Sequence, residues 1–205
     1  MRMGKLAQLI KKMKNVVWIN TKEGDNFIAT GLSIYRADGT PNVEEEEQVA
    51  KILDIEEKKA ISMLIEIQWD GKQDNILGYD LSEGKVENEV FAERMSVAAQ
   101  VNERRYEALR CENGEIFFFD ENLVTPLADV FKNEWWNISY SIRRRTDGNN
   151  WPYIVIKNGF ITIAAIRPAE VLSDDYLREL QDFMLRCADQ LRREKQAARD
   201  EESEE

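Results

Sequence analysis

The chain has 205 residues, of which 43% are hydrophobic and 33% charged, and its formal net charge is −11. This size predicts one domain, or two small ones that share a core. The sequence contains no histidine and only two cysteines, Cys111 and Cys187, which excludes histidine-dependent nucleophilic catalysis and nearly every zinc site.

Residues 1–14 predict a short basic amphipathic helix. Leu6 and Ile10 lie on its apolar face, and lysines, including Lys11 and Lys12, occupy the rest. Such a helix either docks on the body of the protein or serves as a basic arm for nucleic acid or another anionic surface. Lys11 and Lys12 are therefore candidate contacts.

Residues 15–103 predict an N-terminal α+β half. Strands are expected in "VVWIN" and "FIATGLSIYR". A helix is expected after Asn42, which would be its N-cap, with Glu45 completing a capping box. The apolar run 60–69 predicts a central strand, and the weakly patterned residues 82–103 are interpreted as the connection to the second half.

Residues 104–191 predict a C-terminal half that ends in a long helix. Its other expected elements are a hairpin at 106–120, a helix at 120–133 that is distorted near Pro126, an alternating strand from Trp135 to Ile142, and a hairpin at 152–166 with Asn158-Gly159 at its tip.

The last helix is expected to begin after Ser173, a favourable N-cap. An apolar stripe at helical spacing follows it, made of Tyr176, Leu177, Leu180, Phe183, Met184, Cys187 and Leu191. We expect the stripe to pack on the sheet of its own chain or across a symmetric homo-oligomer through residues 174–191. Residues 192–205 lose the apolar face and end acidic, so we expect a disordered tail.

Three consecutive arginines interrupt an otherwise acidic sequence. Strand parity places Arg143 and Arg145 on one polar face and Arg144 on the other. The favoured hypothesis is that they form exposed pairs with the chain's own carboxylates or bind a protein partner. The alternative is a phosphate contact, with Trp135 or Trp151 near enough to stack on a base.

Carboxylates also gather in residues 70–85, as Asp70, Asp74, Asp80 and Glu83 followed by Lys85. Carboxylates of this kind bind Mg²⁺ in nucleases. Glu83 and Lys85 flank a glycine and are typical of a turn, so a solvated loop is the favoured interpretation. We assign no catalytic residue, no metal ligand and no cofactor from the sequence.

The segments "FFDENLVTPLADVF", "WWNISYSI" and "PYIVIKNGFITIAAIRP" lie within residues 118–168. In this order they resemble the last part of the third domain of bacterial DNA sliding clamps, the β subunits that tether the replicative polymerase. The resemblance implies a twisted antiparallel sheet backed by helices. It also implies a diverged relative of the kind carried by phages or integrated mobile elements. Arg167 stands where that family has a groove-lining methionine.

Together these patterns predict an α+β fold with an antiparallel sheet backed by helices, clamp-like topology in the C-terminal half and an extra C-terminal helix. The first functional hypothesis is a non-enzymatic binding protein of phage or mobile-element DNA metabolism, acting through protein–protein contacts and optionally DNA contacts. The alternatives are an acidic interaction protein that inhibits or decoys a host system, and a Mg²⁺-dependent nuclease.

The cellular location is inferred from two features of the sequence, the placement of its cysteines and the length of its apolar runs. Two cysteines far apart favour free thiols in a reducing compartment, and no apolar run approaches the length of about 18 residues that a membrane span needs. We therefore expect a cytoplasmic protein without a membrane partner.

Overall fold

The computed structural model describes residues 1–22, 24–69, 75–171 and 174–203. The chain forms two compact units, Met1–Ala169 and Glu170–Glu205. The first unit contains all the strands of the described residues, and the described part of the second contains one helix.

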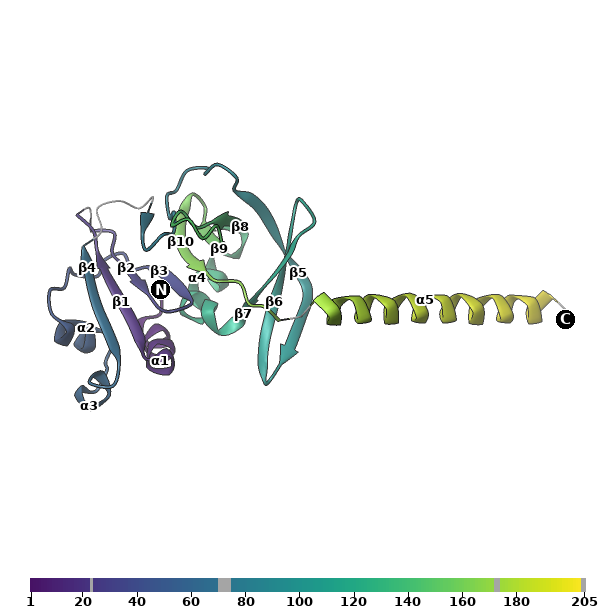
Figure 1. Ribbon diagram of the computed structural model, residues 1–205, viewed down its shortest axis with the longest axis horizontal. Coiled ribbons are helices and arrows are strands. Elements are labelled where there is room, and N and C mark those ends of the chain that lie inside the picture. Colours follow the sequence, from purple (N-terminus) through teal and green to yellow (C-terminus); the bar gives the residue numbers. More distant parts are fainter. Residues whose placement is uncertain (23, 70–74, 172–173, 204–205) are drawn as a thin grey trace. The chain divides into compact units, whose positions relative to one another are not determined.

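The first unit is built on a ten-stranded sheet, counted over the described residues, in the order β4-β1-β2-β3-β10-β9-β8-β5-β6-β7 (Figure 1). The strands are β1 (Asn15–Asn20), β2 (Phe27–Ala29), β3 (Ser33–Arg36), β4 (Leu64–Trp69), β5 (Val90–Val101), β6 (Arg104–Cys111), β7 (Ile116–Asp120), β8 (Ile138–Arg144), β9 (Pro152–Asn158) and β10 (Ile161–Ile166). The helices of this unit are α1 (Met3–Met13), α2 (Glu46–Ile52), α3 (Glu57–Ala60) and α4 (Ala128–Asn133), with 3₁₀ turns η2 (Glu121–Leu127) and η3 (Trp135–Asn137).

The sheet is mixed, whereas the sequence predicted an antiparallel one. β4 runs parallel to β1, with Asn15 opposite Leu64, because the crossover through α2 and α3 returns the chain in the same direction. The prediction of a central strand at 60–69 is also wrong, since β4 forms an edge of the sheet. Leu64 and Trp69 are 52% and 57% exposed, so apolar content alone did not indicate a central position.

The two predicted halves share this one sheet. β3 pairs with β10, with Tyr35 opposite Ala164, which joins the first strands of the chain to the last. The expected connection 82–103 contains β5, the longest strand described. The predicted boundary after residue 103 falls in the turn of the β5–β6 hairpin, where Asn102 and Glu103 adopt positive φ.

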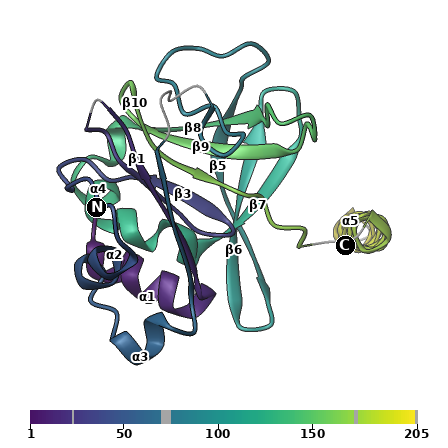
Figure 2. The same cartoon turned by 60° about the vertical axis from the view of Figure 1, so that its left-hand side comes forward.

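Helices cover one face of the sheet. α1 forms as predicted and buries Leu6, Leu9 and Ile10, which join a large apolar cluster with Trp18 and Phe119. In Figure 2, α1, α2 and α3 lie below the strands. This face is therefore held by ordinary apolar packing.

The helix predicted after Asn42 begins later. Its N-cap is Glu45, whose backbone N–H, like that of Glu44, donates to the Gln48 side chain. The side chain of Asn20 holds Val43, since its amide donates to the Val43 carbonyl (2.6 Å) and its oxygen accepts from the Val43 N–H (2.9 Å). This buried pairing postpones the first turn of the helix.

An irregular segment, residues 75–89, covers part of the opposite face. Ile76 and Leu81 are buried in a second apolar cluster with Tyr153 and Val155. Figure 2 shows residues 75–89, which lead into β5, looping above β8 and β9. We call residues 75–89 the covering segment.

The chain between β7 and β8 turns twice. The distortion predicted near Pro126 is confirmed, since η2 contains Pro126 and α4 follows it. The strand predicted from Trp135 begins only at Ile138, because Trp135 and Trp136 lie in η3.

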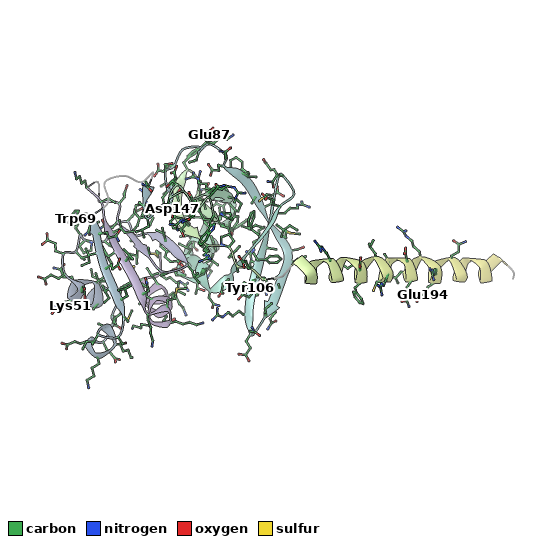
Figure 3. All side chains as sticks on the ribbon, in the orientation of Figure 1. Lys51, Trp69, Glu87, Tyr106, Asp147 and Glu194 are labelled. Atoms are coloured by element: carbon green, nitrogen blue, oxygen red, sulfur yellow. The ribbon has the colours of Figure 1, made fainter. Side chains whose placement is uncertain are left out.

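The second unit is the helix α5 (Asp174–Ser203). It extends past the predicted end at 191, and the expected disordered tail is helical through Ser203. The Gln190 amide donates to Glu194 (2.9 Å), and Arg192 lies 3.8 Å from Asp189; such pairs one turn apart stabilise a helix. Glu194 is labelled on this helix in Figure 3.

No helix in the described part of the chain combines the length and the apolar character needed to cross a membrane.

Candidate interaction surface

Arg143 is one of the largest fully buried side chains of the first unit, with 1% exposure. Its guanidinium donates to three backbone carbonyls of the covering segment, those of Asp80 (2.8 Å), Ser82 (3.0 Å) and Gly84 (3.0 Å). An irregular segment has carbonyls that no helix or sheet satisfies. The planar, five-donor arginine side chain is suited to bind several of them at once.

Glu89 balances this buried charge. Its carboxylate accepts from the Ser141 hydroxyl (2.5 Å) and from Arg143 (3.2 Å), and lies 3.1 Å from the Lys157 ammonium. Burial alone would raise its pKa, but the hydrogen bonds from Ser141, Arg143 and the Val86 N–H lower the pKa to about 2. Glu89 is therefore an anion throughout the physiological range.

The expectation that Arg143 forms an exposed pair is wrong. The strand parity was right, since Arg143 and Arg145 both contact the covering segment. The alternation of side chains along a strand could not show that the covering segment lies over this polar face. Because Arg143 is enclosed, it does not present its charge to a phosphate or to a partner.

The other two arginines have separate roles. Arg145 donates to the Leu77 carbonyl (2.9 Å), pairs with Asp147 (labelled in Figure 3) and lies 4.4 Å from the centre of the Tyr79 ring. Arg144 is exposed and donates to the Asn150 carbonyl at 3.3 Å.

The predicted combination of arginines with a stacking tryptophan is not assembled around Trp135. Trp135 precedes β8, whereas the three arginines lie at or beyond the end of β8. Trp151 is close to them in sequence and is 55% exposed, but Arg167 stands over its ring, with the guanidinium 5.2 Å from the centre. Of the predicted basic arm, Lys11 donates to the Asp54 carbonyl (2.6 Å) and Lys12 is exposed.

Exposed apolar side chains lie on η3 and on the β9–β10 turn, two elements joined by hydrogen bonds of Asn137. We call these side chains the aromatic patch, which consists of Trp135 (70% exposed), Trp136 (69%), Phe160 (87%) and Ile161 (42%). The two tryptophan rings are 6.2 Å apart in an edge-to-face arrangement. The alternation in the sequence places Trp136 on the same face as Ile138, but η3 interrupts that alternation before the strand begins.

Hydrogen bonds hold the two parts of the patch together. The Gly159 N–H donates to the Asn137 carbonyl (2.8 Å), and the Asn137 amide donates to the Asn158 side chain (2.9 Å). A Cβ at Gly159 would lie 3.1 Å from the Asn137 amide nitrogen. The patch is thus positioned by a fixed turn and a fixed strand entry.

A groove of about 820 Å³ lies between β5 and β8. The two strands pair only from Val90 to Ala92, opposite Ile142 to Tyr140, and beyond that point β5 continues alongside β6 without β8. Figure 1 shows the β5–β6 hairpin extending away from the neighbouring strands. The groove is lined by Phe91, Ala92, Glu93, Arg94, Arg110, Cys111, Glu112, Gly114, Ile138, Ser139 and Tyr140.

The groove begins directly after the aromatic patch along the chain, since Ile138 follows η3. Arg94 and Tyr140 also line a second cavity of about 320 Å³, which reaches Phe131 of α4. Arg94 is held by Glu107 at 2.9 Å. The side chains that line the groove include two acidic and two basic ones, so their formal charges cancel.

The predicted carboxylate site is only partly described. Asp70 and Asp74 lie outside the described residues. Asp80 lies 3.6 Å from Arg143, and Glu83 pairs with Arg36 at 2.8 Å. Within the described ranges, no three cysteine, aspartate or glutamate side chains group closely enough to hold a metal ion.

Comparisons of this chain with protein-family models, with curated proteins and with solved structures find no match. The class that the fold and the surface define is an α+β protein with a large mixed sheet backed by helices, which carries an exposed aromatic patch beside a groove.

Proposed function

We propose that this chain is a non-enzymatic binding protein, and that the aromatic patch and the adjoining groove bind an extended segment of a protein partner. The observation that carries the proposal is the exposure of Trp135, Trp136 and Phe160, at 69–87%, on a turn that hydrogen bonds hold in place.

Exposed aromatic side chains in a cluster are unusual on a protein that works alone. Single apolar side chains on a surface need no explanation, but contiguous ones mark interaction sites. Tryptophan dominates the energetics of protein interfaces, and tyrosine and phenylalanine are also enriched there. The aromatic patch thus has the composition of a binding hot spot.

The groove favours an extended polypeptide as the occupant. It opens where β5 leaves β8, so the start of β8 has no register partner in β5. A partner segment added along such an edge gains backbone hydrogen bonds, while its alternate side chains reach the walls of the groove. An apolar residue at one end of that segment would contact the tryptophans.

The charges favour protein over nucleic acid. Nucleic-acid binding depends on clustered cations that neutralise phosphates, but Arg143 is buried, Arg145 pairs with Asp147, and the groove is balanced. The net charge of −11 also opposes binding to the phosphates of a nucleic acid.

A clamp-like topology and a role in DNA metabolism of a phage or mobile element also belong to this proposal. Their support is the resemblance of residues 118–168. The order η2–α4, β8 and the β9–β10 hairpin follows the helix, strand and hairpin order that the resemblance implies.

The test is selection of binders from a displayed library of random linear peptides on the immobilised full chain. We expect Trp136→Ala and Phe160→Ala each to weaken the selected peptides by about tenfold or more, the loss typical of a hot-spot residue. Trp69→Ala is the matched control, because Trp69 is also an exposed tryptophan (57%) but lies on edge strand β4.

Two results would overturn the proposal. One is a set of selected peptides whose affinity depends on Trp69 and not on the aromatic patch. The other is tight, salt-sensitive binding of a short DNA that both patch variants retain, which would place the functional surface elsewhere.

A further inference from the structure

We propose that α5 pairs with α5 of a second copy of this chain in an antiparallel two-helix coiled coil. The inference concerns the second unit alone, so it does not depend on the proposed function of the aromatic patch.

The spacing of apolar residues along α5 is that of a coiled-coil seam. Met184, Cys187 and Leu191 follow one another at intervals of three and four, and in the sequence Leu177 and Leu180 continue the same alternation. Apolar residues at such a 3–4 repeat define the a and d positions of a heptad, whose side chains insert between those of a facing helix.

Nothing within the second unit covers the large described side chains of this seam, and Cys187 is of intermediate exposure. Met184 is 63% exposed and Leu191 57%, and Phe183, which flanks the seam, is 63% exposed. Most helical stability in proteins comes from packing of an apolar face. A seam that its own unit leaves uncovered, on a 30-residue helix, therefore needs a facing surface, and a second helix with the same repeat provides one.

The charges along the helix identify that partner as a second copy and set its direction. Residues 174–182 carry four acidic side chains and one arginine, a net charge of −3. Residues 186–199 carry five basic and two acidic side chains, a net charge of +3. A parallel pair would align like charges, whereas an antiparallel pair places each acidic segment beside the basic segment of the other copy.

One register pairs four of the five seam residues with one another and aligns the opposite charges, and it places Leu177 opposite Glu194. It places Met184 against Cys187 of the second copy and Leu180 against Leu191. Glu179 is then level with Arg192 of the second copy. The arrangement has two-fold symmetry, so the same contacts form twice and the assembly closes at two copies.

The first test is the mass of the full chain in solution by analytical ultracentrifugation. We expect a dimer that Leu191→Asp weakens by about 100-fold or more, because a charge replaces a buried side chain at two equivalent positions. Leu185→Asp is the matched control: Leu185 is 59% exposed but lies off the seam, and we expect its dimer to persist. Near-ultraviolet circular dichroism monitors whether the first unit stays folded.

The second test determines the direction of pairing by disulfide trapping in a Cys187→Ser background. In the proposed register, two copies of residue 191 lie about 16 Å apart along the axis, from a rise of about 1.5 Å per residue. That is too far for a disulfide. We expect Leu191→Cys alone to form none on oxidation, and a mixture with Leu180→Cys to form the mixed disulfide.

The outcomes divide clearly. A monomeric wild type at high micromolar concentration overturns the proposal, and so does a dimer that Leu191→Asp leaves intact. A disulfide between two Leu191→Cys chains overturns the antiparallel direction. A dimer that also weakens with rising salt, as attraction between exposed charged segments requires, supports it.

Discussion

The two faces of the sheet in the first unit are covered in different ways. On one face, α1 satisfies its own backbone and contributes only apolar side chains, such as Leu6 and Ile10, to the core. On the other face, the covering segment has little backbone pairing of its own, and a buried arginine binds its carbonyls.

The difference shows that the free-energy cost of covering a sheet depends on whether the covering segment has regular secondary structure. A helix brings few unpaired polar groups to the interface. An irregular segment brings many, so a donor must be buried to meet them, and Glu89 must be buried to balance the donor. The helical face is therefore held by apolar packing, and the opposite face by a second apolar cluster together with a few specific polar contacts.

The most severe way to break the second cover is Arg143→Met. It leaves Glu89 buried without its main partner, and three carbonyls lose their donor. We expect a loss of about 3–5 kcal/mol in the free energy of unfolding, the range for breaking a buried ion pair. Urea unfolding measures the loss. Arg144→Met, on an exposed neighbour, serves as the control and should change stability by less than about 0.5 kcal/mol.

Leu6→Ala tests the helical face. It creates a cavity under α1, and we expect a loss of about 2–5 kcal/mol. Hydrogen exchange separates the two covers, because Leu6→Ala should lower protection throughout the sheet, whereas Arg143→Met should first expose residues 80–89. Equal exchange patterns in the two variants would show that both covers open together.

Acid should loosen the polar cover before the helical one. The pKa of Glu89 is lowered from 4.5 to about 2, so its contribution is complete above pH 4.5 and is lost as the pH falls from 4.5 towards 2. With about 1.4 kcal/mol per pKa unit, reduced for partial solvation, we expect a loss of about 1–3 kcal/mol. In Glu89→Gln the free energy of unfolding should change less between pH 4.5 and pH 2. An unchanged loss of stability in acid would exclude Glu89 as its source.

The smallest effect is expected at the end of the covering segment. Arg145→Ala removes a contact to the Leu77 carbonyl and a partly exposed pair with Asp147. We expect a loss of about 0–1 kcal/mol. A loss as large as that of Arg143→Met, measured by the same urea titration, would mean that the two arginines act as one network.

Local signals predicted the elements with local causes. Helix α1 follows from its apolar face, the β9–β10 hairpin from Asn158-Gly159, and the interruption of the helix from Pro126. The pairing of β3 with β10 and the parallel return of β4 bring together residues far apart in sequence. No short-range pattern specifies them.

The candidate surface was visible only in part. Strand parity grouped Arg143 with Arg145, but the burial of Arg143 depends on Glu89, 54 residues away, in a stretch without an apolar pattern. Trp135 is a candidate contact from the sequence, whereas the alternation only groups its neighbour Trp136 with Ile138 and gives no sign of its exposure. The phenylalanine directly after Asn158-Gly159 was the one sequence signal of an exposed aromatic residue, since side chains at a hairpin tip point to solvent.

The pairing of β3 with β10 also has a consequence for synthesis of the chain. Tyr35 meets Ala164, so about 130 residues must be translated between the two strands. At about 5–20 residues per second, this takes roughly 6–26 s. During that interval β3 is an open strand edge on the nascent chain, the kind of edge that recruits other strands. The edge closes only when the β9–β10 hairpin has left the ribosome, which makes the last hairpin of the sheet its protection against aggregation.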